Sequence, residues 1–522
     1  MEAVKSGDMI HTDVEHLEVK TGPALEPVGT VKLLDQGDII LIPTPTNEPR
    51  DPLNLPNWRK INIVCNVSIF AATATLMASS FGAILPIVTA EYDGDPRVND
   101  LVTLPALFIG IGNFIFVPIS HAVGRRATYL FSLTMLVACS IWCACSKSLE
   151  SHIAGRVILS LAAGQAEALC PIMIQEVYFL HQRGTKIAIF CAAQTLGTAV
   201  LTVASSYLAA NIGWRWWYGV FACISFACWL NAVFLVPETK FTRTVSAQAG
   251  LGHEDAQTLG PLRPITSNAR PPIDHTNYEP RTWRHDMALF HGKPNWSEAV
   301  SCWKQMAQVI CFPNVFWLVL CSGAFLGVFV MFGAVFAQVL VSPPYNFDYE
   351  WIGFVFAGQI VVSMVVIPAQ GWLSDWLVKL FGKRNGGLAE PETRLIPLII
   401  PFIVAIISTV IFGRACQTPQ DWHWSAIVVS FNVEFYGFVG VVVASFTYVI
   451  DSYPARSDAA LVVLCFARGV ISFALSYGSL SFLGIKSTKY ALVFDTSAII
   501  IGALGFIGIF VYLWGKKIRQ IT

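Results

Sequence analysis

Long apolar stretches dominate this sequence and recur about twelve times along it. A helix needs about 20 apolar residues to cross the roughly 30 Å hydrocarbon layer of a membrane, where every backbone amide must be paired within the segment. Six stretches precede a polar segment in the middle of the chain, and six follow it. The sequence therefore predicts an all-α membrane protein of twelve transmembrane helices in two six-helix pseudo-repeats.

The predicted spans in the first half cover 61–89, 101–119, 127–145, 152–179, 187–210 and 214–236. Those in the second half cover 314–341, 351–373, 395–413, 424–450, 459–482 and 490–514. They divide the chain into a cytosolic tail expected to be disordered (1–57), a bundle (58–236), a linker (237–310), a second bundle (311–515) and a short cytosolic tail (516–522). The linker is polar, rich in proline and without sustained periodicity, so we expect a flexible cytosolic connection.

Composition excludes several classes of protein. Hydrophobic residues make up 54% of the chain and charged residues 13%, whereas soluble domains carry about 25% charged residues. The 34 basic and 34 acidic residues balance, so bulk charge suggests no nucleic-acid partner. The 13 cysteines lack metal-ligand spacing. We therefore expect no metal and no cofactor.

Basic residues in the short loops predict the orientation of the chain, because such loops stay in the cytosol. Under the predicted spans they gather on one side, together with the basic carboxyl tail. Both termini are therefore expected in the cytosol, most simply at the plasma membrane. The first fifty or so residues are polar and have no basic region leading into a short apolar stretch, so we expect no removable signal peptide.

Two similar turns follow the second and the eighth predicted span. The first runs from Val117 to Arg126 and the second is Gly371-Trp372-Leu373-Ser374-Asp375-Trp376. An array of apolar helices built twice from one plan is typical of a secondary transporter, which moves one half against the other.

The residues before the first span, Asp51-Pro52-Leu53-Asn54-Leu55-Pro56-Asn57-Trp58-Arg59-Lys60, resemble those of the drug:proton antiporter-like branch of the major facilitator superfamily. The two turns resemble the loop motif of that superfamily, although His121 stands where the family has an aspartate. The resemblance implies gating roles for the turns and for Asp451 at the end of the tenth span. The implied gating residues are His121, Gly124, Arg125, Arg126, Gly371, Asp375 and Asp451.

The fourth span resembles the fourth helix of the family, whose arginine is implicated in proton coupling. It contains Arg156 and, eleven residues later, Glu167. Eleven residues of helix correspond to about 16 Å, so we expect no direct pair between the two. A charge within the membrane costs about 3 kcal/mol or more unless it faces a polar cavity or a partner.

The fifth span keeps only Gly197 of the glycine-rich signature of the exporters. Leu201, Thr202, Ser205 and Ser206 occupy the other positions, which weakens the expectation of drug export more than that of the fold. The candidate residues for proton coupling or for the substrate cavity are Arg156, Gln165, Glu167, Gln194, Gln359, Glu434 and Arg468. Glu167 and Glu434 could face the cavity and bind a proton or the substrate. The alternative is a structural ion pair, of Glu434 with Arg468 or of Glu167 with Arg156.

Two directions of transport stay open. The first is efflux of a small amphipathic molecule, a fungal secondary metabolite or drug, in exchange for protons. The second is proton-coupled uptake of a nutrient such as a polyamine, a cation or an iron chelate. An integral membrane enzyme is disfavoured because the ten histidines form no cluster between spans, and no phosphate-binding loop is present. The expected partners are the small molecule, protons and the bilayer, for a monomeric protein.

Overall fold

The computed structural model describes residues 34–35, 38–39, 41–241, 243, 251–252, 263–264, 273–274, 278–290, 293–384, 391–453, 456–483 and 489–521. Most of the predicted amino-terminal tail lies outside these residues. Two short antiparallel pairs, β1 (Leu34–Asp35) with β2 (Asp38–Ile39) and β3 (Leu251–Gly252) with β4 (Arg263–Pro264), flank the helices.

Helices of the first half, in order, are η1 (Pro52–Asn54), α1 (Asn57–Ser79), η2 (Ser80–Ala83), α2 (Leu85–Glu91), η3 (Pro96–Asn99), α3 (Asp100–Val123), α4 (Arg125–Cys145), α5 (Leu149–Ala163), η4 (Gly164–Ala166), α6 (Leu169–Val177), α7 (Leu180–Ile212) and α8 (Trp214–Leu235). The linker contributes α10 (Trp283–Asp286) and α11 (Trp296–Val309). The second half contains α12 (Pro313–Val341), η6 (Tyr349–Phe356), α13 (Ala357–Val361), the π-helical turn η7 (Val362–Val366), α14 (Ile367–Arg384), η8 (Pro391–Leu398), α15 (Ile399–Gln417), α16 (Trp424–Ser452), α17 (Ser457–Leu483) and α18 (Tyr490–Ile521).

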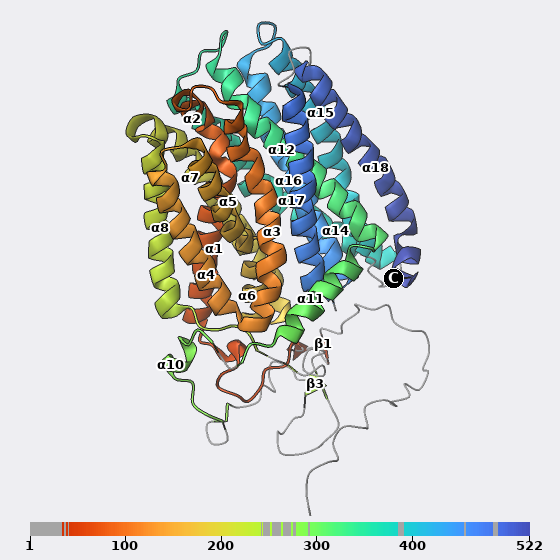
Figure 1. Ribbon diagram of the computed structural model, residues 1–522. Helices are drawn as coiled ribbons and strands as arrows, with labels where there is room; N and C mark the ends of the chain where they lie inside the picture. The colour runs from red at the N-terminus through yellow and green to blue at the C-terminus, as the bar shows by residue number, and fades with distance from the viewer. Residues whose placement is uncertain are drawn as a thin grey trace, which may run out of the picture.

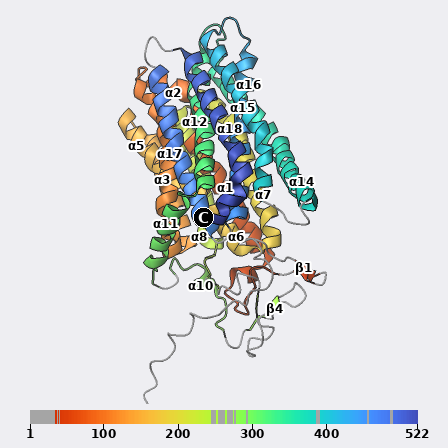
Figure 2. The same cartoon turned by 90° about the vertical axis from the view of Figure 1, so that its right-hand side faces the viewer.

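Within the described part of the chain, twelve helical segments are long and apolar enough to cross a membrane. Six precede the linker and six follow it, so the predicted fold class is confirmed. The two halves stand side by side, with α1 to α8 on the left of Figure 1 and α12 to α18 on the right. The carboxyl terminus and the described linker pieces lie at one end of the bundle (Figures 1 and 2), which we call the linker side. The opposite end is the far side.

Small residues let α3 and α17 approach closely along one seam between the halves. A Cβ atom added to Gly110 would lie 2.7 Å from the carbonyl oxygen of Phe466, and one added to Gly469 would lie 2.5 Å from that of Ala106. Only residues without a side chain leave room for such backbone contact, as at many helix interfaces in membranes. This seam holds the two halves together.

The second seam joins α7 to the eighth span, and it is closed only toward the far side. The backbone amide of Gly353 in η6 donates to the Ser206 hydroxyl at 2.7 Å, and that hydroxyl donates to the carbonyl of Glu350 at 3.1 Å. Contacts of α7 continue with α13 and η7. In Figure 1, α14 runs away from α7 toward the linker side.

One helix in the linker was not predicted. The linker was expected to lack periodic structure, but α11 has a buried stripe of Ala299, Cys302, Met306 and Val309. It packs against both α3 and α17. The expectation was wrong here because the 14-residue helix is amphipathic rather than wholly apolar. Its hydrophobic periodicity is difficult to recognise within a segment that is otherwise polar.

The segment before α1 is tied to the linker through Asp51, which is fully buried. Its carboxylate accepts hydrogen bonds from Arg243 at 2.6 and 2.9 Å and from the backbone amides of Thr46 and Leu53. Burial alone would raise the pKa of Asp51, but the bonds and charge of Arg243 and the two amides outweigh burial and hold that pKa below its usual range. The motif that resembles the antiporter branch thus anchors the linker to the first half.

The glycine seam can be tested by overpacking it. Gly469→Leu should lower the melting temperature of the purified protein by several degrees, because a side chain pressed on the α3 backbone costs about 1–3 kcal/mol. Gly478→Leu on the same helix is the control, since a Cβ atom there meets nothing within 4 Å. Equal melting curves for the two variants would show that the seam is not closely packed.

Candidate functional site

An ion pair joins the two halves in the middle of the bundle. Glu167 belongs to the fourth span and Arg468 to α17, and their side chains approach to 2.5 Å. Among the ion pairs of the described residues, this is the one that links transmembrane helices of different halves. Arg468 is 5% exposed and Glu167 is 24% exposed, so the carboxylate remains partly accessible. Each charge needs the other, because an unpaired ion at this depth is costly.

A break in the fourth span positions Glu167. The helix changes from α5 to the single turn η4 at Gly164 and resumes as α6 at Leu169. Pro171 has no N–H for the carbonyl of Glu167, which removes one hydrogen bond of a regular helix at this point. The Asn113 side chain on α3 lies 3.5 Å from the carboxylate. The interruption turns the acid toward α17 and α3.

Arg156 is satisfied by oxygen atoms of the first half. Its Nε donates to the carbonyl of Leu101 at 2.8 Å, and its terminal nitrogens donate to the carbonyls of Met77 and Ala78 and to the Tyr218 hydroxyl at 2.9 to 3.1 Å. The Leu101 carbonyl lacks its helical donor because Pro105 lies four residues later. The other two carbonyls close the last turn of α1, the negative end of that helix. Arg156 therefore clamps the first, second and fourth spans and contacts no carboxylate among the described residues.

Glu434 lies within the second half, away from both arginines. It is fully buried on α16 and accepts hydrogen bonds from Ser408 at 2.9 Å and Thr409 at 3.4 Å, both on α15. Neither structural pair considered from the sequence, Glu434 with Arg468 or Glu167 with Arg156, forms in the described residues. The structure instead pairs Glu167 with Arg468.

The three glutamine candidates lie in different places. Gln165 donates to the carbonyl of Gly112 at 3.0 Å and is buried. Gln194 on α7 donates to the Thr75 hydroxyl of α1, also at 3.0 Å. Gln359 on α13 is buried, and its amide nitrogen has no partner among the described residues. Gln165 lies within η4, two residues before Glu167, and the other two belong to the helices of the second seam.

The first gating turn is built around Gly124. Its φ of 129° is a conformation that glycine adopts without strain, and a Cβ atom here would meet the carboxylate of Glu238 at 2.5 Å. That carboxylate accepts hydrogen bonds from backbone amides at the start of α4 and after α8. At the start of α4 a negative charge is favoured by the helix dipole. The donors are the amides of Arg125, Arg126, Thr239 and Lys240.

Arg125 is the centre of a latch on the linker side. It is buried, and its guanidinium bonds to Glu176 at 2.9 Å, to the Ser120 hydroxyl at 2.8 Å and to Nδ1 of His121 at 3.1 Å. Because an arginine can only donate, His121 accepts here and is neutral. Arg126 donates instead to the carbonyls of Val236 and Val233 at the end of α8.

The second half repeats this latch. Arg394 at the start of the ninth span pairs with Asp451 at the end of the tenth, just as Arg125 at the start of the third span pairs with Glu176 at the end of the fourth. Sequence reasoning missed Glu176 and Arg394 as latch residues. Comparison of the two halves could have found both, since Asp451 and Glu176 hold matching places in the helix order. Gly371 and Asp375 lie on α14, and the Asp375 side chain is outside the described residues.

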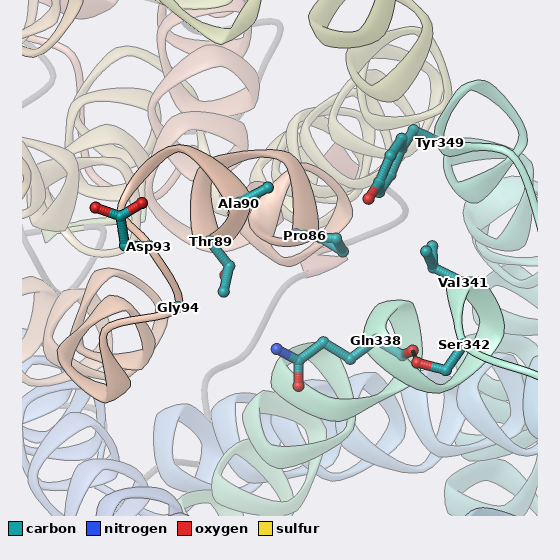
Figure 3. Close-up of a pocket in the computed structure, with 9 residues that line it drawn as sticks. All are labelled: Pro86, Thr89, Ala90, Asp93, Gly94, Gln338, Val341, Ser342 and Tyr349. Atoms are coloured by element: carbon teal, nitrogen blue, oxygen red, sulfur yellow. Dashed lines mark hydrogen bonds between the residues drawn. The ribbon is translucent and has the colours of Figure 1, made fainter.

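A pocket of about 350 Å³ opens between the halves on the far side. Figure 3 shows Pro86, Thr89 and Ala90 of α2 facing Gln338 and Val341 of α12 and the following Ser342, with Tyr349 beside them. Deeper in the bundle, Gly82 and Gly333 bring η2 and α12 into backbone contact, since a Cβ atom on Gly82 would lie 2.3 Å from the carbonyl oxygen of Gly333. The pocket is therefore a vestibule separated from the ion pair.

Comparison with known proteins agrees with this architecture. The sequence model of a family described as the Major Facilitator Superfamily matches residues 67–476, well over half of the chain. An uncharacterized MFS-type transporter of Schizosaccharomyces pombe is 25% identical, over 94% of this chain and 90% of that protein. The efflux pump atB of Aspergillus terreus is 23% identical, over 79% of this chain and 82% of that protein. The xylose transporter XylE from E. coli, in a partially occluded inward open conformation, has the same fold with a TM-score of 0.53 and 15% identity, covering 88% of this chain and 99% of that one.

The clamp formed by Arg156 makes a clear prediction for stability. Arg156→Lys should lower the melting temperature by several degrees, because one ammonium group cannot serve three carbonyls in this geometry, and each buried group left unpaired costs about 1–3 kcal/mol. Arg97→Lys is the matched control, since Arg97 is 57% exposed. A melting temperature equal to that of the control would mean that Arg156 is not a structural clamp.

The latch at His121 can be tested with charge. His121→Asp should raise the melting temperature, because a carboxylate beside Arg125 forms a charge-assisted hydrogen bond worth about 1.5–3 kcal/mol. His121→Lys should lower it, because two cations would then share one buried site. Thermal unfolding of both variants measures the effect, and shifts in the same direction would contradict the assigned contact.

Proposed function

The chain belongs to the major facilitator superfamily of membrane transporters, and from this premise we propose that it exports a small amphipathic molecule in exchange for protons. The single observation that supports coupling is the ion pair of Glu167 with Arg468 across the halves. Similarity to proteins named efflux pumps supports the direction. We further propose a monomer in the plasma membrane.

The orientation follows from the basic loops, which put the linker side in the cytosol. In that orientation the chain is inward-facing. Ser206 and Gly353 close one seam toward the outside, and Gly82 and Gly333 close the vestibule, while the close contacts of α7 with the eighth span run from η6 to η7. A substrate then enters from the cytosol, which is the loading side of an exporter.

Protonation of Glu167 is the proposed coupling step. In the inward-facing state the acid is ionised and paired, so Coulomb attraction holds the two halves in this arrangement. A proton on the carboxylate removes that attraction and frees α17 from the fourth span. If Glu167 takes its proton from outside and releases it to the cytosol, one proton moves inward in each cycle.

The two latches bias the same cycle from the linker side. Arg125 with Glu176 and Arg394 with Asp451 each tie the start of one helix to the end of the next within a half. Asp458, at the start of α17, interacts electrostatically with Arg125 across the halves. When the halves close on the linker side, the distance between Asp458 and Arg125 changes. The charges of the latches can therefore favour or oppose that motion.

Proton-coupled uptake is the second candidate, because the exporter signature of the fifth span is eroded. At its serine positions, Ser206 bonds across the interface and Ser205 bonds within α7. An ion pair between halves couples transport equally well in either direction. The direction is therefore a question for flux measurements in oriented vesicles.

The coupling proposal predicts a separation of two activities in proteoliposomes. Glu167→Gln should reduce flux driven by a proton gradient on the order of tenfold, because a charged hydrogen bond worth about 1.5–3 kcal/mol is lost, while exchange of substrate without a gradient persists. A panel of fungal metabolites and amphipathic drugs, tested first in a yeast without its own pumps, supplies the labelled substrate.

Glu150→Gln is the control for this experiment, since Glu150 is a 79% exposed acid of the far side. Gradient-driven flux of Glu167→Gln equal to that of Glu150→Gln would remove Glu167 from coupling. Accumulation of substrate inside cells that rises with an inward proton gradient would rule out export and favour uptake.

A further inference from the structure

Helix α11 of the linker lies against the outer side of the α3–α17 seam (Figure 1). Its beginning is level with the end of α3, because the backbone amide of Asn295 donates to the carbonyl of Ala122 at 3.1 Å. Further along, the indole nitrogen of Trp303 donates to the carbonyl of Phe114 at 3.0 Å. The Phe114 ring in turn contacts Phe466 of α17, with ring centroids 4.8 Å apart.

The bond from Trp303 fixes the depth of α11. Pro118 has no N–H, so the carbonyl of Phe114, four residues earlier, has no donor within α3. The indole supplies that donor. Phe114 precedes the last residue of α3 by nine positions, which corresponds to about 13 Å along the helix axis. Trp303 therefore reaches the level of the membrane-spanning part of α3.

Two adjacent apolar stripes run along α11. One consists of Ala299, Cys302, Met306 and Val309 and is buried against the bundle. The other consists of Trp296, Val300, Trp303 and Ala307, which recur every three or four residues. Trp296 is 55% exposed and Val300 is 46% exposed. The remaining arc carries polar residues, among them Ser301 and Lys304. Within the second stripe Trp303 is partly buried, and the other three side chains are exposed.

We propose that the exposed stripe of α11 is a lipid-binding surface, and that α11 is an interfacial helix of the linker-side leaflet. Tryptophan side chains favour the region between headgroups and acyl chains. An amphipathic helix with tryptophan on its apolar face buries that face at the boundary between headgroups and acyl chains. The Trp303 ring lies beside Phe114, with ring centroids 6.5 Å apart. Phe114 and Ile115 on α3 and Phe131 on α4 are themselves exposed.

The position of α11 in the chain supports lipid over a protein partner. Only Ile310, Cys311 and Phe312 separate it from Pro313, the first residue of the next span. A helix that ends so close to a transmembrane helix is held at the membrane surface. Lys304 borders the apolar stripe, where its long side chain can reach the headgroups while its stem stays on the apolar side.

The test places a fluorescent probe on each face of α11. Val300→Cys and Ser301→Cys are labelled with a small polarity-sensitive fluorophore in the full chain, reconstituted into phosphatidylcholine nanodiscs. Neighbouring positions on one helix make these a matched pair, since both side chains are exposed. The background replaces the accessible native cysteines by serine: Cys65, Cys145, Cys191, Cys223 and Cys311.

Lipids brominated on the acyl chain and aqueous iodide are the two quenchers. The expected result is several-fold stronger quenching by brominated lipid at Val300→Cys than at Ser301→Cys, with the opposite order for iodide. Stronger quenching by iodide at Val300→Cys would overturn the proposal, because the stripe would then face water. Protection of that probe from both quenchers would also overturn it and would assign the stripe to a protein contact.

Discussion

Every polar group buried among these helices must find a partner inside the protein, because lipid offers none. The consequence is clearest at two prolines of α3. Pro105 leaves the carbonyl of Leu101 without a helical donor, and Arg156 donates to it instead. Pro118 leaves the carbonyl of Phe114 without a helical donor, and Trp303 donates to it instead. A proline that weakens one helix thus creates the attachment point for another segment. The packing of the first half and the seat of α11 both depend on this exchange.

Buried charged residues are compensated in three different ways in this protein. At the linker side, Arg125 and Arg394 each meet an acid of their own half, so the latches stabilise the halves as separate bodies. In the middle, Glu167 and Arg468 belong to different halves, so their attraction depends on how those bodies are placed. On α16, Glu434 is served only by hydroxyl groups. Among the described residues no cation pairs with it, so its burial is compensated by hydrogen bonds alone.

The twelve spans could be predicted from the sequence, because length and hydropathy alone determine which segments can cross a bilayer. The helix α11 could not, since it is short and half polar. Charged residues within the spans were identified, but their pairing was not. Glu167 reaches Arg468 through a helix break and through a fold that brings the fourth and eleventh spans within side-chain reach, and no local pattern encodes that distance. Arg156 was expected to need an acid or a wet cavity, yet it is satisfied by carbonyls that two helix irregularities expose.

The two seams between the halves differ, and this difference has a mechanical consequence. Along α3 and α17 the backbones touch and α11 packs against both helices, whereas the close contacts of α7 with the eighth span run only from η6 to η7. If the halves move as rigid bodies about the α3–α17 seam, their displacement is largest on the opposite side, at α7 and the eighth span. The contacts that change most on such a motion are those of α7 with the eighth span, including the hydrogen bond of Gly353 to Ser206.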